Sequence, residues 1–365
     1  MIWNLLKILP KRALGVDIGT SFIRVAEMSR VGGKIKLENY GESKALTFYE
    51  KPFRTFEKNT LLLSNKDISR AILAILEEAR IKTKRAVFSI PDFSTFFTWF
   101  SLPPMTQGEI PSAVRYEAQQ HIPLPISEVT LDWQIIEGKA SNHQQSRLKI
   151  LLAAVPKEII FQYQEIASLA GLELKAVEAE VFALARSTIR NETITVALLD
   201  IGAQSTTISI IDNRLLKRSH SFDVSGNEMT KVIAKSLSAS SEEAENIKIK
   251  CGLNPISQFA ATSLPPGQDL RNLLCPLIDL IILELEKISQ DFFREEAKDI
   301  QKIIISGGTA LLPGLKEYFA ERIKKPVEIA NPFADVFYPP LLEETIKQMG
   351  PSFAIAAGMA LRGLE

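Results

Sequence analysis

Residues 13–21 read ALGVDIGTS, and residues 196–206 read VALLDIGAQST. Each stretch is an apolar run that ends in Asp-Ile-Gly and continues with small polar residues, and a second apolar run follows it. This pattern predicts a strand, a tight polar loop and a second strand. Because the two copies lie about half the chain apart, the sequence predicts two related halves that face each other.

The first loop opens an antiparallel meander. Residues 22–28 form the second apolar run, Gly32 and Gly33 supply a turn, and a third strand-like run follows. Asp212 and Asn213 supply the matching turn in the second copy. A first strand that feeds an antiparallel strand instead of a helix excludes the opening of a Rossmann fold. We therefore expect an α/β protein with duplicated halves.

The rest of the chain divides around these copies. We expect an N-terminal segment at 1–12, a first half at 13–90, an inserted subdomain at 91–175 and a second half at 176–365. The inserted region has its own strand and helix patterns, punctuated by prolines. A last helix over 353–361 is expected to return to the first half. Helical periodicity also predicts helices over 226–237, 241–252 and 270–293.

The composition is that of a folded protein with balanced charge. Hydrophobic residues make up 46% and charged residues 24% of the chain. Lys and Arg total 43, as do Asp and Glu, so we expect no nucleic-acid partner. Cys251 and Cys275 form no Cys-x-x-Cys pair, which favours two buried thiols in a reducing compartment.

Membrane contact is expected to be indirect. No apolar run reaches the roughly 20 residues that a membrane-spanning helix needs. Residues 1–12 place their apolar side chains before Lys11 and Arg12, which is the reverse of a secretory signal. The sequence leaves open whether this segment packs on the protein or touches a membrane surface.

The two polar loops carry the first candidate chemistry. Loops of glycine and small hydroxyl residues point several backbone N–H groups at one spot, which suits a phosphate group. Asp17 and Asp200 precede the loops and suit a Mg²⁺ held through water, since Mg²⁺ keeps most of its waters. One Asp-x-Gly is also a common turn, so the prediction depends on the pair. The candidate nucleotide-binding residues of the loops are Gly19, Thr20, Ser21, Gly202, Ala203, Gln204, Ser205 and Thr206.

Two further features lie in the second half. Gly307, Gly308 and Thr309 follow an apolar strand, and the missing side chains let a flat ring or a ribose approach the backbone. Glu245 and Lys248 share one face of a predicted helix and are placed to grip a ribose and its base. Each feature has an ordinary alternative, namely a strand-to-helix turn and a solvated, salt-bridged helix face.

These four features in this order resemble the superfamily of actin, the heat-shock ATPases and the sugar kinases. The resemblance covers nearly the whole chain and implies an actin-like, ribonuclease H-like two-domain fold that binds ATP and Mg²⁺. Residues 17–21 resemble the first phosphate loop, 200–206 the second and 307–309 the adenosine loop. Gly226 resembles the glycine that approaches the nucleotide after the second loop.

Residues 178–185 resemble the segment that connects the halves, which in ATPase members places an acidic or amide side chain near the attacking water. Glu180 is the matching position and the candidate catalytic base. An acidic residue at a helix N-terminus also suits the helix dipole, so both interpretations stay open. Ala203 and Gln204 stand where many members have a second glycine, so we expect nucleotide binding with weak or no hydrolysis.

The inserted region narrows the resemblance to two families, the cell-division protein FtsA and the pilus-assembly protein PilM. FtsA-like chains continue into a linker and an amphipathic membrane helix, whereas this sequence stops at Glu365, which favours PilM. The stretches that closely resemble PilM are 102–105, 113–123, 129–132, 180–186 and 352–362.

The PilM resemblance implies a cytoplasmic adaptor at the inner membrane, in the platform that assembles type IV pili. It implies docking of the N-terminal cytoplasmic tail of PilN, contact with other platform components, and membrane association through its partner. An FtsA-like filament-forming or tethering protein and a small-molecule kinase are the alternatives, and self-association is left open. The residues that either line a peptide groove or form a subdomain core are Phe93, Phe96, Phe97, Trp99 and Phe100.

Overall fold

The computed structural model describes residues 11–45, 52–54, 61, 63–138, 147–190, 193–254 and 269–365. Most of the expected N-terminal segment therefore lies outside the described residues.

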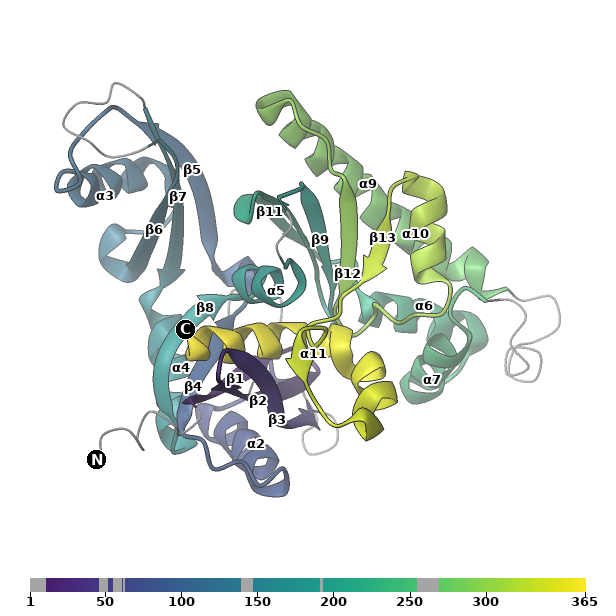
Figure 1. Ribbon diagram of the computed structural model, residues 1–365. Helices are drawn as coiled ribbons and strands as arrows, with labels where there is room; N and C mark the ends of the chain where they lie inside the picture. The colour runs from purple at the N-terminus through teal and green to yellow at the C-terminus, as the bar shows by residue number, and fades with distance from the viewer. Residues whose placement is uncertain are drawn as a thin grey trace.

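Two sheets with matching strand order form the two halves (Figure 1). The first has the order β14-β3-β2-β1-β4-β8 and the second the order β11-β10-β9-β12-β13. The strands of the first sheet are β1 (Lys11–Ile18), β2 (Phe22–Val31), β3 (Lys34–Lys44), β4 (Arg85–Ile90), β8 (Glu173–Ala179) and β14 (Val336–Phe337). Those of the second are β9 (Val196–Ile201), β10 (Thr206–Asp212), β11 (Leu215–Phe222), β12 (Lys302–Ser306) and β13 (Val327–Ile329).

The predicted duplication is confirmed by the pairing of the strands. In each half a central strand, β1 or β9, pairs antiparallel with the next strand and parallel with a later one, β4 or β12. Asp17 lies opposite Arg24 in the first half, and Asp200 lies opposite Thr207 in the second, so the two hairpins have the same register. The chain therefore has an α/β, actin-like architecture.

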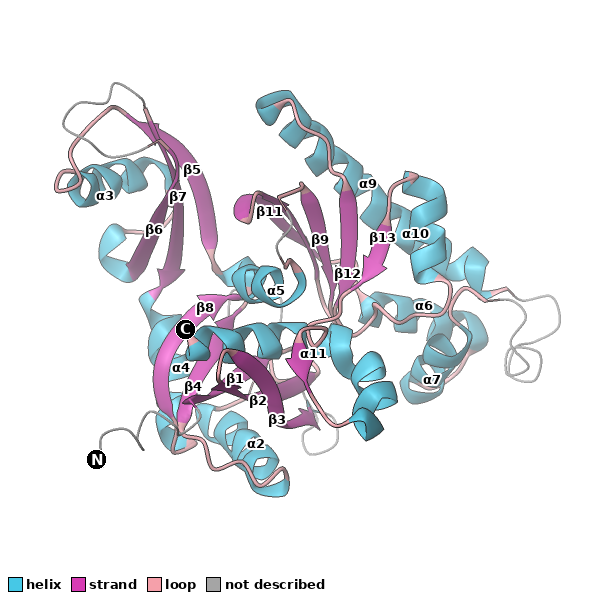
Figure 2. Ribbon diagram, viewed as in Figure 1, coloured by secondary structure: helices cyan, strands magenta, loops and turns pink. Residues whose placement is uncertain are grey.

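Helices cover both sheets and fill the space between them (Figure 2). Helices α2 and α4 share one core with the first sheet, helices α6, α7, α9 and α10 share another with the second sheet, and α5 and α11 pack between the two sheets. The helices are α2 (Asn65–Glu78), α4 (Lys157–Leu169), α5 (Glu180–Thr188), α6 (Gly226–Leu237), α7 (Ser241–Cys251), α9 (Leu270–Glu296), α10 (Leu315–Ile323) and α11 (Glu343–Leu364).

The apolar runs of β1 and β9, residues 13–16 and 196–199, are buried on both faces, which is typical of central strands covered by helices on both sides. Leu14 and Val16 of β1 enter the core beneath α2, while Ala13 packs against α11 on the other face. In β9, Leu199 enters the outer core and Leu198 the layer between the sheets. Period-two alternation thus sends successive side chains to opposite layers.

Helix α11 approaches its neighbours through glycine. A Cβ at Gly15 of β1 would lie 1.9 Å from the carbonyl oxygen of Ala356 in α11. A Cβ at Gly358 of α11 would lie 2.0 Å from the carbonyl oxygen of Ala183 in α5. Only glycine allows backbones to pack at this separation. The helix between the halves is therefore held closely by both β1 and α5.

The last helix is longer than the sequence analysis expected. It begins at Glu343 instead of residue 353, and Pro351 lies inside it. Proline lacks the N–H of a helical hydrogen bond, which made a boundary near Pro351 the natural expectation. The carbonyl oxygen of Pro351 accepts hydrogen bonds from the Gly307 N–H at 3.1 Å and the Ser306 hydroxyl at 3.0 Å. The helix thereby contacts the turn after β12.

A separate three-stranded sheet, β5-β7-β6, forms the insertion together with α3. Its elements are β5 (Phe96–Leu102), α3 (Ile110–His121), β6 (Val129–Glu137) and β7 (Leu148–Pro156). Helix α4 and the start of β8, residues 173–175, fall within the expected range 91–175 but pack with the first half. Tyr163 of α4 is buried in the core with α2, and β8 pairs with β4. We propose on this basis that the insertion is shorter than expected from the sequence.

The aromatic residues of the insertion divide between two contacts. Phe96 and Phe100 of β5 pack in the core of the insertion, whereas Phe97 and Trp99 pack against the layer between the sheets. The rings of Phe97 and Phe182 of α5 meet edge to face with centroids 5.9 Å apart. Alternation along β5 therefore lets one strand both fill the insertion and attach it to the body of the protein.

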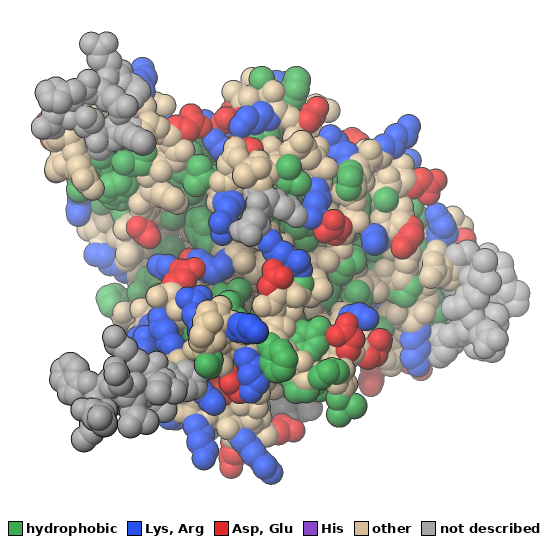
Figure 3. Space-filling model, viewed as in Figure 1, with side chains coloured by type: hydrophobic (Ala, Val, Ile, Leu, Met, Phe, Trp, Pro, Cys, Tyr) green, Lys and Arg blue, Asp and Glu red, His purple; other side chains and the backbone are tan. Residues whose placement is uncertain are grey.

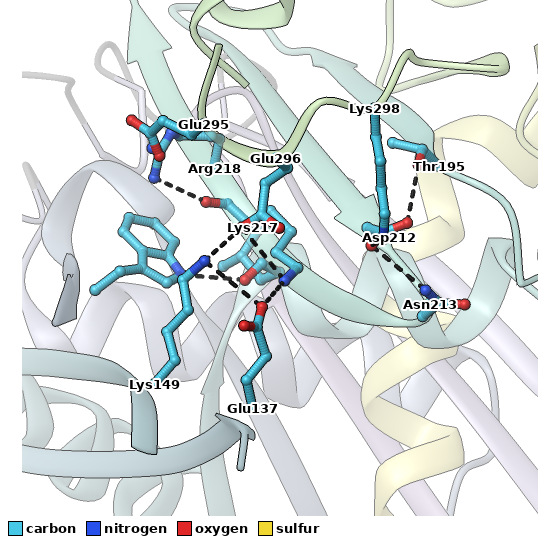
Figure 4. Close-up of polar contacts among 12 residues, drawn as sticks. Glu137, Lys149, Thr195, Asp212, Asn213, Lys217, Arg218, Glu295, Glu296 and Lys298 are labelled. Carbon is cyan, nitrogen blue, oxygen red and sulfur yellow. Dashed lines mark hydrogen bonds and ion pairs between the residues drawn. The ribbon is translucent and has the colours of Figure 1, made fainter. Parts of the chain in front are cut away.

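An ionic network joins the insertion to the second half (Figure 4). Lys217 of β11 is buried, and its Nζ lies 2.8 Å from Glu137 of β6 and 3.5 Å from Glu296 of α9. Lys149 of β7 pairs with the same two carboxylates. Nearby, the Trp99 indole N–H donates to the carbonyl oxygen of Leu216 at 3.1 Å. These contacts fix the insertion against the edge strand β11.

The surface carries both signs of charge across the face drawn in Figure 3. Of the two cysteines, Cys251 is buried as expected, but Cys275 is only partly buried, although it packs against the core of the second half. Within the described ranges, no helix is both long and apolar enough to cross a membrane.

Candidate functional site

Both predicted phosphate loops adopt the same tight turn. The Gly19 N–H donates to the carbonyl oxygen of Phe22, and the Gly202 N–H donates to that of Ser205, each at 2.9 Å. A Cβ at Gly19 would lie 2.8 Å from the Phe22 carbonyl, so a side chain there would disturb the turn. The two copies of the sequence pattern therefore form loops with the same geometry.

The carbonyl oxygens of the loops hydrogen-bond to neighbouring segments. Those of Thr20 and Ser21 accept from the N–H groups of Phe53 and Ala45, at 2.9 and 2.8 Å. The Ala203 carbonyl accepts from the N–H of Asn227 at 3.0 Å. These contacts fix the loop backbones. Thr206 is placed differently from the other loop residues, because it is buried in β10 and its hydroxyl donates to the carbonyl oxygen of Val224 at 2.6 Å.

The two aspartates lie at the ends of β1 and β9. Asp17 is buried and accepts a hydrogen bond from the Ser89 hydroxyl of β4 at 2.7 Å. Within the described part of the chain, the buried Oδ1 of Asp200 has no hydrogen-bond partner. Burial raises the pKa of Asp200 to about 7, and the negative charges of Glu180 and Asp17 add to the effect. An unpartnered buried carboxylate oxygen is costly and suits a bound cation or its water.

Residues from four separate motifs meet at one corner of the site. The Gly226 N–H donates to the carbonyl oxygen of Gly202 at 3.0 Å, and the Thr309 N–H donates to that of Ile201 at 3.2 Å. A Cβ at Gly226 would lie 2.6 Å from the Thr309 hydroxyl and 3.5 Å from the Lys248 Nζ. The second phosphate loop, the start of α6, helix α7 and the turn after β12 therefore converge.

Lys248 organises this corner. Its Nζ donates to the carbonyl oxygen of Gly226 at 2.9 Å, to the Thr230 hydroxyl at 2.8 Å and to Glu245 at 2.7 Å. Burial lowers the pKa of Lys248, against the opposing effect of Glu245. The pair thus joins a buried Lys248 to a partly exposed Glu245 next to Gly226.

The glycines after β12 have different roles. Gly307 has a φ of +91°, and a Cβ there would lie 2.5 Å from the carbonyl oxygen of Ile201 and 2.8 Å from Asp200 Oδ1. A side chain at Gly308 would meet nothing within 4 Å. Gly307 is therefore required by the backbone, while Gly308 leaves open space beside it.

Glu180 begins α5 and is buried beside two residues that the sequence analysis did not identify. Its Oε1 lies 2.7 Å from Arg54 Nη2, and its Oε2 accepts from the Asp92 N–H at 3.4 Å. Asp92 in turn accepts from the N–H of Val181 at 3.1 Å, which caps α5. Burial raises the pKa of Glu180, although Arg54 opposes the rise, and burial with the nearby Glu180 charge raises the pKa of Asp92 well above its usual range.

Of the two residues that the sequence analysis did not identify, Asp92 could have been detected from the sequence and Arg54 could not. Asp92 lies two positions after the end of β4, and Asp17 and Asp200 likewise stand near the ends of their strands, so this position was a detectable signal. Arg54 lies in a polar stretch without periodicity, so no sequence pattern indicated it. The site thus combines buried carboxyl groups, fixed glycine turns and open space beside Gly308, which suits an anionic ligand that brings a divalent cation.

Comparison with known proteins agrees with this architecture. The chain is 28% identical over 211 residues to the cell division protein FtsA of Streptococcus pneumoniae, which covers 51% of this chain. That match spans 45% of the FtsA chain, less than half of its length.

Two solved structures are similar along nearly the whole chain. One, a PilM-PilN type IV pilus biogenesis complex, has a TM-score of 0.80 at 24% identity and covers 97% of this chain and 98% of that one. The other, MreB5 of Spiroplasma citri bound to ADP, has a TM-score of 0.51 at 15% identity and covers 93% and 98%. The family model described as type IV pilus assembly protein PilM matches residues 15–364. The chain therefore belongs to the PilM family of type IV pilus assembly proteins.

Proposed function

We propose that this protein binds Mg-ATP between its halves and acts as an adaptor in the type IV pilus assembly platform. The observation that carries the proposal is the convergence of Gly202, Gly226, Lys248 and Thr309 beside the open space at Gly308. A site for the adenosine end of a nucleotide requires close approach to backbone, and glycine provides it. The PilM family match supports the place in the pilus machinery.

The proposed roles follow from position. The turns that begin at Gly19 and Gly202 would face the phosphates with N–H groups other than those of the two glycines, which donate within the turns. Asp17 and Asp200 would hold Mg²⁺ through water. A bound Mg²⁺ would offset the negative charge of the triphosphate beside these buried carboxylates. The unpartnered oxygen of Asp200 supports a cation at this place.

Hydrolysis is proposed to be weak or absent. Both oxygens of Glu180 are engaged, one by Arg54 and the other by the Asp92 N–H. A carboxylate whose two oxygens are both engaged must give up one of these interactions before it can take a proton from water, even though burial raises its pKa. Bound nucleotide would then mainly stabilise the conformation in which the two halves are closed around it.

We propose the N-terminal cytoplasmic tail of PilN as the protein partner. The similar solved structure is a PilM-PilN complex, which supports a partner of this kind. The protein would then be cytoplasmic and reach the inner membrane, with other platform components, through that partner.

A second candidate function is favoured by the FtsA similarity, which covers half of the chain. An FtsA-like protein would form filaments or tether others to the membrane. Sedimentation with and without Mg-ATP separates the two proposals, because nucleotide-dependent pelleting supports the filament and a constant small species supports the adaptor.

Calorimetry with both ligands tests the adaptor proposal. Mg-ATP and a synthetic PilN tail are titrated separately and together into the purified protein, with a scrambled tail as the control. Binding of ATP and of the tail at roughly micromolar affinity supports the adaptor. Binding of ATP without the tail contradicts the partner but keeps the nucleotide site, and binding of neither ligand overturns the proposal.

A further inference from the structure

Arg54 links the first phosphate loop to Glu180. It follows Phe53, a fully buried residue whose N–H donates to the carbonyl oxygen of Thr20 in that loop at 2.9 Å. The Arg54 guanidinium lies 2.7 Å from Glu180, at the start of the helix between the two halves. Phe53 therefore contacts the loop through its backbone, and the adjacent Arg54 contacts α5 through its charge.

Not all of the hydrogen-bond donors of the Arg54 guanidinium have a partner among the described residues. Arg54 is 9% exposed, and its Nε and Nη1 have no hydrogen-bond partner among the described residues. Its guanidinium carbon lies 5.5 Å from the centroid of the Phe93 ring. Buried arginine donors are normally satisfied, and the buried Tyr163 hydroxyl, which also lacks a hydrogen-bond partner among the described residues, lies close enough to Arg54 for each to shift the pKa of the other.

The charges around Arg54 are unbalanced. Asp17, Asp92, Glu180 and Asp200 are linked carboxyl groups: Asp17 raises the pKa of Glu180 and of Asp200, and Glu180 and Asp200 raise that of Asp92. In the described part of the chain, Arg54 makes the one salt bridge to this group. A polyphosphate that enters beside several buried carboxylates meets repulsion unless cations offset their charge.

We propose that Arg54 is a positioning residue of this cleft, which neutralises Glu180 beneath the first phosphate loop and so allows a triphosphate to bind. This inference builds on the proposed nucleotide site. Its competitor is a purely structural ion pair that holds the start of α5 and has no effect on ligand affinity. The positioning role and the purely structural role predict different Mg-ATP affinities when the charges of Arg54 and Glu180 are removed together.

The test is a double-variant cycle on Mg-ATP affinity, measured by calorimetry. The variants are Arg54→Met, Glu180→Gln, the combination of both, and Arg54→Lys, which keeps the charge. Thermal unfolding without nucleotide is recorded for each variant, so that loss of fold is seen separately from loss of affinity.

Arg54→Met should weaken Mg-ATP binding about tenfold or more, because it leaves the Glu180 charge uncompensated beside the phosphates. Glu180→Gln, the double variant and Arg54→Lys should each stay within about threefold of the wild type. Equal affinity of Arg54→Met and wild type, or equal weakening of Arg54→Met and the double variant, overturns the inference.

Two controls keep the outcomes separate. If Arg54→Met does not fold, Arg54→Lys and the double variant decide, and a loss of about tenfold or more in either contradicts the role of the charge. If the wild type binds no Mg-ATP, the proposed function fails and this inference falls with it. A wild type that binds while Arg54→Met binds equally well overturns the inference alone.

Discussion

Gly226 and Thr309 lie so close that a Cβ at position 226 would come within 2.6 Å of the Thr309 hydroxyl. The two residues belong to different motifs, one at the start of α6 and the other after β12. Their contact brings the second phosphate loop and the proposed adenosine loop into one site. It also makes the size of the side chain at position 226 a direct probe of that site.

Gly226→Val should reduce Mg-ATP affinity about tenfold or more, because the new side chain would displace Thr309 and press on Lys248. Isothermal titration calorimetry measures the change. Gly108→Val is the matched control, since a Cβ at Gly108 meets nothing within 4 Å and its backbone is not in the left-handed region. Equal affinity of the two variants would show that this corner does not touch the nucleotide.

Because of Asp200, the nucleotide-free protein should be more stable in mild acid than at neutral or higher pH. Its pKa is raised to about 7 by burial and then by Glu180 and Asp17, compared with roughly 3.9 in an unfolded chain. The folded state therefore holds the proton more tightly, so the penalty is absent below roughly pH 4 and grows to about 4 kcal/mol above roughly pH 7.

Urea denaturation at about pH 5.5 and pH 8 measures this penalty. Asp200→Asn should reduce the difference between the two pH values, because an amide has no charge to bury, while Asp92 and Glu180, whose pKa values are also raised, keep their contributions. The exposed Asp223→Asn serves as the control and should behave like the wild type. A pH difference as large in Asp200→Asn as in the wild type would assign the penalty to other groups.

Lys217→Met should loosen the insertion from the second half. The substitution leaves Glu137 and Glu296 without their buried partner, which should cost about 2 kcal/mol of unfolding free energy. Hydrogen exchange should rise in β5 and β6. Lys287→Met is the control, because its ion pair with Glu284 is exposed and should contribute less than about 0.5 kcal/mol. Unchanged exchange in Lys217→Met would mean that the apolar contacts alone hold the insertion.

Two glycines of α11 should respond oppositely to alanine. Gly358→Ala places a Cβ 2.0 Å from the carbonyl oxygen of Ala183 and should cost about 3 kcal/mol or more. Gly350→Ala meets only ordinary contacts, at 3.5 Å or more, and should be neutral or raise stability by up to about 1 kcal/mol through helix propensity. Similar melting temperatures for the two variants would contradict the close packing of α11 on α5.

The duplicated architecture was predictable because it depends on local pattern. The apolar runs that end at Asp17 and Asp200 are buried on both faces, and the glycine turns after them adopt matching geometry. The helices expected over 226–237 and 241–252 occur with nearly those bounds. Periodicity and capping signals suffice where the local preference agrees with the tertiary structure.

Other features depend on contacts that no local pattern encodes. Helix α11 continues through Pro351 because packing between the halves outweighs one lost hydrogen bond. Helix α4 joins the first half because Tyr163 finds its core there. The role of Arg54 appears only when the segment after β3 is seen next to Glu180, which lies 126 positions further along the chain.

The most direct test of the nucleotide cleft is a calorimetric titration of the purified wild type with ATP, with Mg²⁺ present and after its chelation, beside Asp200→Asn with Mg²⁺. We predict one binding site per chain with Mg²⁺, and a loss of affinity of about tenfold or more both without Mg²⁺ and in the variant. Absence of binding to the wild type with Mg²⁺, or binding that neither chelation nor the substitution changes, would contradict a magnesium-nucleotide site between the two halves.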